Sequence, residues 1–357
     1  MTEIIKQCVG IDCAKDELVC SFSVMKSDME VISVSNKNFT NDKNGFAKLL
    51  LWAAKLRNPD LPVYYVVEAT GVYHESISLF LYLKEQTICV LLPNKIKKFS
   101  GTLKVKTVTD KVSAQVIANF GLEKKLDPWQ PPSEKYNTLR QLTREREQLI
   151  AEKTMIKNKI HAETHGAWVN KDSMRRMKKR LLLLEKQCAE IEDEIKHIVK
   201  SDEILQQKIN NICSIPGVSI ITAATVVAET QGFNLIKNKK QLVSYAGLDV
   251  VEKQSGISVH GKPKISKKGN KYLRKSLHMP AFSAIRYQPN AKNLYTRLIS
   301  KHGIKMKACV AVQRKLLELI YTIWNTGQVY DSNYQHQSKK IEQPKETALY
   351  GLVLDRP

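Results

Sequence analysis

Two long stretches in the middle of the chain show a step of three or four positions between mostly apolar residues, with Arg146 and Lys153 taking two places in the first stretch. This pattern constrains the fold more than any other feature of the sequence. The first stretch covers residues 139–160, the second covers residues 181–198, and residues 163–172 between them are irregular. Because such a step places side chains on one helix face, the pattern predicts a helical coiled-coil hairpin over residues 133–205. A plain helical bundle within one domain is the alternative.

The first 121 residues alternate instead between strand and helix patterns. Three strand patterns are followed by helix, strand, helix and strand, which predicts a mixed α/β sheet with helical cover in a domain of residues 1–125. The predicted strands cover residues 8–12, 18–24, 30–34, 63–67 and 88–92, and the predicted helices cover residues 41–55 and 73–85.

Residues 210–330 form a third block, for which we expect a mainly α-helical domain. Ser214–Gly217 (SIPG) precede an apolar helix predicted at residues 220–229. A helix, a Pro-Gly turn and a second helix resemble a helix-hairpin-helix element, which presents backbone N–H groups to a phosphate. An ordinary turn is the alternative. Residues 331–357 are polar and lack periodicity, so we expect a disordered tail.

The charge of the chain is strongly positive and unevenly distributed. There are 57 Lys and Arg against 35 Asp and Glu, a formal net charge of +22. Residues 1–121 hold 15 basic and 12 acidic side chains, whereas residues 253–317 hold 16 basic side chains and no acid. A like-charge field of this size destabilises a compact fold unless a polyanion neutralises it. We therefore expect nucleic acid as the partner, with a membrane surface or an acidic protein as the alternative.

The sequence predicts neither a membrane protein nor a secreted one. Its apolar runs are too short to span a bilayer, and its N-terminus lacks the layout of a secretory signal. The seven cysteines are odd in number and none has CxxC spacing. We expect reduced, mostly buried thiols in a cytoplasmic protein, without a disulfide or zinc framework.

Three acids of the first block stand where a sheet could bring them together. Asp12 ends the first predicted strand, Glu68 follows the strand of residues 63–67, and Asp110 begins a helical stretch. Carboxylates at the ends of adjacent strands, with one on a later helix, can hold one or two Mg²⁺ ions for phosphodiester chemistry. Taken singly, each acid also fits a turn or a helix cap.

A second candidate site lies in the basic block. Ser255 precedes Gly256 in a Lys-rich segment, where a serine hydroxyl could attack a phosphate. On residue type alone, Ser and Gly as builders of a turn are the better interpretation. The cations that we expect to position backbone phosphates are Lys262, Lys264, Lys267, Lys268, Lys271 and Arg274.

Six motifs give the chain a resemblance to a known family. In order, they are GIDCAKDE, VVEATGVYHE, KTVTDKVSAQVIA, SIPGVSIITAATVVAE, LVSYAGLDV and QSGISVHGKPKISKKGNKYLRKSL. Over about residues 7–325 the chain is similar to the DEDD (Piv-type) transposases of the insertion-sequence family numbered one hundred and ten. The resemblance implies an α/β RuvC-like (RNase H-like) domain, followed by a C-terminal transposase domain at residues 210–330 that carries a serine nucleophile.

The resemblance also implies a mechanism. Asp12, Glu68 and Asp110 match the family's acidic positions, and Ser255 matches its nucleophile, which joins covalently to DNA. Such enzymes recombine donor and target DNA under the guidance of a bridge RNA transcribed from the element's ends. Metal ions and Ser255 would form a composite site across the subunits of a homo-oligomer, a dimer or a tetramer.

One position departs from the family pattern. The fourth acid is replaced by Ser113, a weaker metal ligand, which leaves the number of metal ions open. Ser258 and Ser266 are weaker nucleophile candidates, because neither occupies the Ser-Gly position. Two other functions stay open: a RuvC-like structure-specific nuclease of the junction-resolvase type, and a nucleic-acid-binding protein without catalysis.

Overall fold

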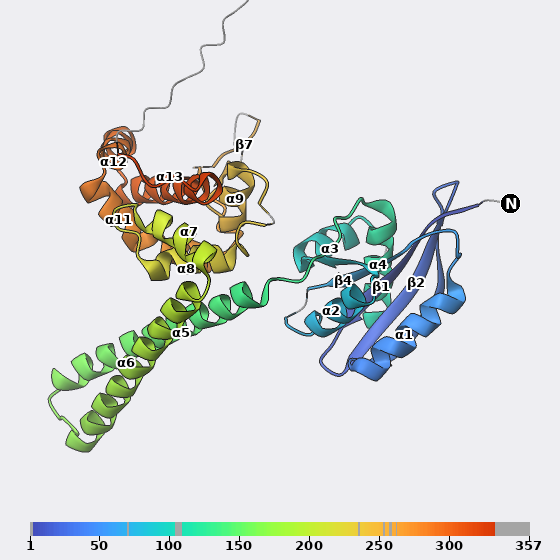
Figure 1. The fold of residues 1–357 in the computed structure, drawn as a ribbon, viewed down its shortest axis with the longest axis horizontal. Helices are drawn as coiled ribbons and strands as arrows, with labels where there is room; N and C mark the ends of the chain where they lie inside the picture. Colours follow the sequence, from blue (N-terminus) through green and yellow to red (C-terminus); the bar gives the residue numbers. More distant parts are fainter. Residues whose placement is uncertain are drawn as a thin grey trace, which may run out of the picture. The chain divides into compact units, whose positions relative to one another are not determined.

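The chain divides into two compact units, residues 1–132 and residues 133–357. The computed structural model describes residues 3–69, 71–103, 109–234, 236–252, 254–256, 259–261 and 263–332 (Figure 1). All but the first two residues of the predicted tail lie outside these ranges. The division of the second unit into a hairpin domain and a C-terminal domain stays a prediction. In the described part of the chain, no helix is long and apolar enough to cross a bilayer.

The first unit is built on a five-stranded sheet in the order β3-β2-β1-β4-β5. β1 is antiparallel to β2 and parallel to β4, β2 is antiparallel to β3, and β4 is parallel to β5. The predicted mixed sheet is therefore confirmed, although its first three strands are longer than expected. The strands are β1 (Ile4–Cys13), β2 (Glu17–Lys26), β3 (Val31–Thr40), β4 (Val63–Glu68) and β5 (Thr87–Leu91).

Helices cover both faces of this sheet (Figure 1). Alternate residues of β1 point to opposite faces, as in any strand. Val9 and Ile11 pack in one apolar core with residues of α1 and α2, whereas Cys8 packs in a second core with residues of α3 and α4. The helices of the first unit are α1 (Lys43–Leu56), α2 (Glu75–Leu83), α3 (Pro93–Ser100) and α4 (Asp110–Glu123).

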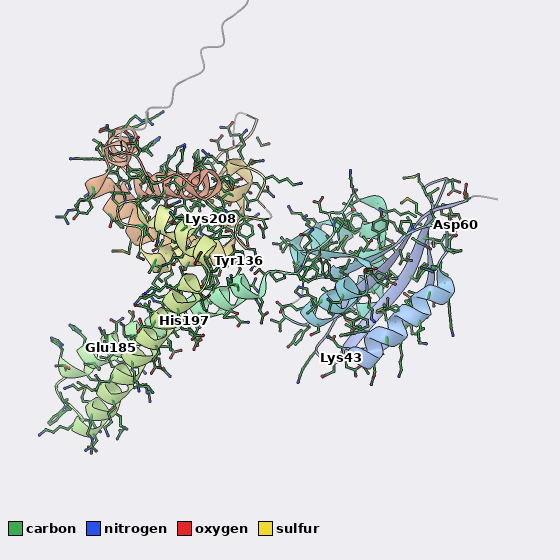
Figure 2. The ribbon with its side chains drawn as sticks, viewed as in Figure 1. Lys43, Asp60, Tyr136, Glu185, His197 and Lys208 are labelled. Atoms are coloured by element: carbon green, nitrogen blue, oxygen red, sulfur yellow. The ribbon has the colours of Figure 1, made fainter. Side chains whose placement is uncertain are left out.

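The second unit begins with two long helices that lie side by side, α5 (Glu134–Thr164) and α6 (Lys171–Lys200) (Figure 1). Apolar residues such as Ile156 and Leu184 are buried on these helices, while charged side chains such as Glu185 lie on the outer surface (Figure 2). The two predicted helices and the break between them are present. Coiled-coil geometry stays a prediction.

The rest of the second unit is mainly helical, as expected. Its main core joins side chains of α5 and α6 with those of five later helices, and a smaller core joins α11, α12 and α13. Six of the seven cysteines are buried, so the predicted mostly buried thiols are confirmed. The elements are α7 (Glu203–Cys213), α8 (Ile220–Glu229), α9 (Lys239–Ala246), β6 (Val250–Val251), β7 (Gln254–Ser255), β8 (Val259–His260), β9 (Lys264–Ile265), α10 (Lys271–Ser276), α11 (His278–Tyr287), α12 (Pro289–His302) and α13 (Lys305–Thr326).

Candidate active site and nucleic-acid interface

The strand pattern directs two of the predicted acids to the same face of the sheet. Asp12 lies four residues after Cys8 on β1, and Glu68 lies two residues after Val66 on β4. Cys8 and Val66 both belong to the core on the α4 face. Because side chains alternate along a strand, Asp12 and Glu68 share this face. Parallel pairing of β1 with β4 brings both acids to one edge of the sheet.

Two glycines allow α4 to lie directly on the sheet, and its N-terminus therefore reaches this edge. A Cβ on Gly10 would lie 2.2 Å from the carbonyl oxygen of Ala114, and a Cβ on Gly121 would lie 2.6 Å from the Sγ of Cys8. α4 and β1 therefore run in opposite directions, and the N-terminal end of α4 lies near the C-terminal end of β1. This register places Asp110, the first residue of α4, beside Asp12.

A half-buried lysine fixes the other end of α4. The Nζ of Lys6 on β1 donates to the carbonyl oxygens of Gly121 and Leu122, at 2.7 and 2.9 Å. A cation at these carbonyls is favourable, because the C-terminus of a helix carries partial negative charge. The helix is therefore anchored at its C-terminal end and in its middle.

The acids at the edge of the sheet repel one another. Burial, followed by the charge of Asp110, raises the pKa of Asp12. Burial, followed by the charge of Asp12, raises the pKa of Glu68. Among the described residues, no Lys or Arg forms an ion pair with any of these three acids. The edge therefore concentrates negative charge that the described side chains do not neutralise.

Ser113, the position of the missing fourth acid, lies at the same edge. It lines a pocket of about 590 Å³ together with Glu68. Thr109, one residue before α4, caps the helix by accepting from the backbone N–H of Val112 at 3.3 Å. An acid at position 113 would therefore lie near Glu68, but in this chain Ser113 offers only a hydroxyl.

The acids fit a hard divalent cation by their chemistry. Carboxylate oxygens are the ligands that Mg²⁺ prefers, and a bound cation would offset the repulsion that, after burial, raises the pKa values of Asp12 and Glu68. In the side-chain arrangement of the described residues, no three His, Cys, Asp or Glu side chains already form a metal site. Asp12, Glu68 and Asp110 are the residues that would hold the ion.

Ser255 lies in the second unit, on a small β-hairpin. β7 pairs with β8 in antiparallel fashion, with Ser255 opposite Val259. The side chain of Ser255 is exposed, and the next residue, Gly256, has a φ of +56°, which favours glycine. The serine is therefore open to a large substrate.

The basic segment after this hairpin is held in place by hydrogen bonds to side chains and to the backbone. Ser266 donates from its Oγ to Asp249, at 2.5 Å, and Arg274 donates to the carbonyl oxygens of Ala246 and Gly269, at 2.8 and 3.1 Å. The guanidinium of Arg274 thus has a structural role beside the predicted contact with phosphate. Lys264, Lys267, Lys268 and Lys271 are exposed, whereas Lys262 lies outside the described residues.

An ion pair with a buried carboxylate connects this segment to the hairpin helices, and the sequence did not predict it. Glu229, only 2% exposed, accepts two hydrogen bonds from Arg144 on α5, at 2.7 and 2.8 Å. The amide of Asn270 donates to the same carboxylate at 2.6 Å, and the ring of Tyr272 lies 4.6 Å from the Arg144 guanidinium carbon. Glu229 therefore fixes α5, α8 and the start of α10 relative to one another.

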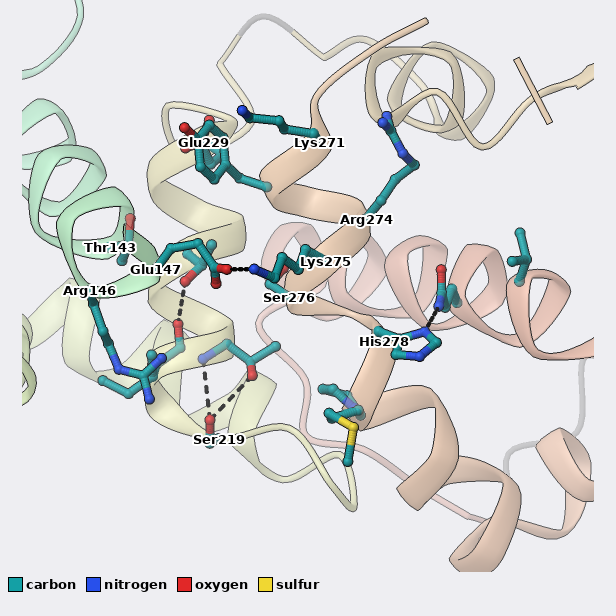
Figure 3. A pocket seen from close by; sticks show the side chains of 18 of the residues that line it. Thr143, Arg146, Glu147, Ser219, Glu229, Lys271, Arg274, Lys275, Ser276 and His278 are labelled. Atoms are coloured by element: carbon teal, nitrogen blue, oxygen red, sulfur yellow. Dashed lines mark hydrogen bonds and ion pairs between the residues drawn. The ribbon is translucent and has the colours of Figure 1, made fainter. Parts of the chain in front are cut away.

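A pocket of about 910 Å³ opens beside this ion pair (Figure 3). Lys275 points across it to Glu147 on α5, and Arg146 pairs with Glu192 at 2.6 Å. Among the described residues, Lys267 and Lys271 line the pocket without an acidic partner. The predicted basic interface thus includes a concave surface with cations available to a polyanion.

The turn predicted to resemble a helix-hairpin-helix element joins α7 to α8. Gly217 has a φ of +91°, and a Cβ there would lie 2.3 Å from the Cβ of Ser283 on α11. Ser219 caps α8 by accepting from the N–H of Thr222, and both residues line the large pocket. Contact of this turn with phosphate stays a prediction.

Comparison with known families decides the identity of the chain. A family model described as "Transposase", for the DEDD transposases of IS110 elements, matches residues 9–165, and a model described as "Transposase IS116/IS110/IS902 family" matches residues 209–296. The chain belongs to the IS110 family of DEDD transposases. It is therefore an enzyme of DNA strand transfer, and the two matches include both candidate sites.

Curated relatives of the transposase agree with this assignment. The pilin gene-inverting protein of Moraxella bovis is 27% identical over 331 residues, which cover 91% of this chain and 98% of that protein. The transposase for insertion sequence element IS1111A of Coxiella burnetii is 30% identical over 154 residues, 42% of this chain and 41% of that protein. Among solved structures, Thermus thermophilus RuvC in complex with a Holliday junction substrate matches 34% of this chain and 99% of its own, with a TM-score of 0.26 and 10% identity, and this likeness plays no part in the assignment.

Proposed function

We propose that this transposase cuts and rejoins DNA through a covalent phosphoserine intermediate on Ser255. Asp12, Glu68 and Asp110 would assist by holding Mg²⁺. The observation that carries the metal-binding part of the proposal is the group of acids at the edge of the first unit's sheet, whereas the role of Ser255 rests on the family resemblance and on its exposed position. Asp12 and Glu68 have raised pKa values and, among the described residues, no cationic partner, which supports a role in binding a metal ion.

The chemistry of the serine balances without an energy source. The Oγ of Ser255 forms a bond to phosphorus, the bond from phosphorus to one deoxyribose oxygen breaks, and the proton lost by the serine is matched by the proton gained by the departing hydroxyl. Attack on the phosphoserine by the hydroxyl of a second strand reverses these changes and releases the serine. A bound Mg²⁺ would supply electrostatic stabilisation of the phosphate oxygens.

The cations of the second unit would hold the DNA backbone. Lys264, Lys267, Lys268 and Lys271 are exposed and would contact phosphates without reading sequence. Specificity would then come from a bridge RNA, as in other guided systems, an expectation that rests on the family resemblance. The name of the Moraxella bovis relative, a gene-inverting protein, also supports site-specific recombination.

A covalent-trapping assay tests this proposal. The full chain is incubated with Mg²⁺, RNA transcribed from the element's ends and a labelled DNA duplex that spans the element junction. A denaturing gel then shows whether the label migrates with the protein. We expect an adduct with the wild type and with Ser300→Ala, a control at an exposed serine on α12, but none with Ser255→Ala.

Other results would favour the alternatives. Cleaved DNA without an adduct, unchanged by Ser255→Ala, would leave a metal-dependent nuclease of the junction-resolvase type. Activity that survives both Asp12→Asn and Glu68→Gln would remove the acids from the mechanism. An adduct that forms equally well without the RNA would refute the role of a guide RNA.

A further inference from the structure

The far end of the helical hairpin carries an unusually exposed aromatic side chain. Trp168 lies in the loop between α5 and α6 and is 92% exposed. Large aromatic side chains are normally buried in folded proteins, so a solvated Trp indicates a binding surface. The hairpin is described from end to end, and none of its other rings or cations is in ring contact with Trp168.

The residues around Trp168 are strongly basic. We call residues 157–180 the distal hairpin. It holds eight cations and only two acids, Glu163 and Asp172. Asp172 pairs with Arg175 at 3.0 Å, and Lys157 pairs with Glu185 at 3.6 Å. The other six cations are exposed and, within the described chain, have no acidic partner: Lys159, Lys171, Arg176, Lys178, Lys179 and Arg180.

Five of these cations lie on α6, between Lys171 and Arg180, and the sixth, Lys159, lies on α5. Met174 and Met177 are partly buried, and Leu184 on the same face is buried. The exposed cations occupy the remaining helix surface. From Lys171 to Arg180 this basic part of α6 rises by about 13 Å, the length of about four nucleotides of a duplex strand.

We propose that the distal hairpin binds an unpaired segment of nucleic acid, with its phosphates on the exposed cations of α6 and a base stacked on Trp168. The combination of a cationic track with an aromatic platform is how proteins hold single strands. This surface is separate in sequence from the basic block of residues 253–317. The proposal extends the proposed function, because a recombining DNA or its guide RNA would supply the unpaired strand.

The charge distribution disfavours two other occupants. A second copy of the distal hairpin would bring two sets of six unpaired cations together, which is repulsive. A membrane-binding helix needs a continuous apolar face toward the lipid, but on α6 Met177 is partly buried and Leu184 is buried, so this face is not free. A polyanion with exposed bases suits both Trp168 and the cations.

Binding can be measured on the full chain in the presence of EDTA, which removes Mg²⁺-dependent chemistry. The probes are labelled DNA and RNA oligonucleotides of equal length, each single-stranded or fully duplex, at several salt concentrations. We compare Trp168→Ala with a triple variant, Arg176→Ser, Lys179→Ser and Arg180→Ser. A matched triple variant on exposed lysines of α1, Lys43→Ser, Lys48→Ser and Lys55→Ser, serves as the control.

The proposal predicts a distinct pattern of results. Trp168→Ala should weaken single-strand binding by about five-fold or more, affect duplex binding less, and abolish most of the tryptophan quenching that the oligonucleotide causes. The distal triple variant should reduce the slope of log K against log salt by about 2, whereas the α1 control should leave affinity and slope close to wild type. The DNA and RNA probes show which strand binds more tightly.

Three outcomes would overturn the proposal. The first is an equal effect of the distal and α1 variants, because non-specific charge would then explain the binding. The second is that Trp168→Ala weakens binding to phosphatidylserine vesicles more than it weakens binding to oligonucleotides. The third is a change of oligomeric state by Trp168→Ala with oligonucleotide binding unchanged. A failure of Ser255 to form an adduct would refute the proposed function alone, because this assay depends on no catalytic step.

Discussion

Replacement of Gly10 by alanine should separate the acids without touching any of them. A Cβ at this position would lie 2.2 Å from the carbonyl oxygen of Ala114 and 2.4 Å from the backbone nitrogen of Ala118, whereas ordinary van der Waals contact begins at 3.4 Å. Both atoms belong to the backbone of α4, so no rotamer change relieves the clash. The helix must therefore move away from β1 by about 1.2 Å at this point.

This displacement has two measurable costs. Overpacking of this kind typically costs about 1–3 kcal/mol, which lowers the unfolding midpoint by several degrees. Lys6 restrains the C-terminal end of α4, so much of the movement falls on the N-terminal end that carries Asp110. A misplacement of about 1 Å at a catalytic group can cost about 100-fold in rate. We therefore expect adduct formation to fall far more than stability alone explains.

Gly101→Ala is the matched control. Gly101 has a φ of −67°, and a Cβ there would lie 3.5 Å from its nearest neighbour, the carbonyl oxygen of Lys98. Thermal unfolding and the rate of covalent trapping are measured for both variants and the wild type. If Gly10→Ala unfolds and forms the adduct as the wild type does, α4 does not need its close approach, and the account of how the acids are positioned is refuted.

Three further predictions follow from the same contacts. Burial and repulsion raise the pKa of Asp12 in the folded state, so stability is lost as the pH rises from the ordinary pKa of an aspartate through the raised one. Asp12→Asn should therefore raise the unfolding temperature of the metal-free protein at pH 7. In thermal scans the variant should also lose the stabilisation that Mg²⁺ gives the wild type. Arg144→Met leaves the buried Glu229 without its cation and should cost about 3 kcal/mol in denaturant unfolding, the low end for a buried pair because Arg144 itself is partly exposed. Arg146→Met, whose partner Glu192 is more exposed than Glu229, should cost about 1 kcal/mol or less. Ser113→Asp should lower stability without metal and strengthen Mg²⁺ binding in calorimetry, and weaker binding would contradict the position we give it.

The sequence predicted the type and order of most strands and helices of the first unit, but not the residues at which they begin and end. The core of each strand shows an apolar pattern, whereas β3 continues through polar residues because backbone pairing needs no apolar side chain. α3 was missed because Pro93 suggested only the end of a strand. In the structure Pro93 begins α3, where its missing N–H has no helical partner to lose.

The site was predictable only where neighbouring residues carry the information. Asp12 and Glu68 end strands, and parallel pairing of such strands brings their ends together. The approach of α4 depends on Gly10 meeting Ala114, a contact that no local pattern encodes. The ion pair of Arg144 with Glu229 likewise joins residues 85 positions apart. Distances of this kind follow from packing, and packing is decided by the whole core.

The two units distribute charge in a way that bears on the order of binding. The acids of the first unit would repel a phosphate backbone until a divalent cation neutralises them, because among the described residues no Lys or Arg pairs with them. The excess of cations lies in the second unit, where Lys267 and Lys271 line an open pocket. If the proposed function is right, DNA can bind the second unit without Mg²⁺, whereas engagement of the acids requires it. Mg²⁺ should therefore change DNA affinity modestly and adduct formation completely.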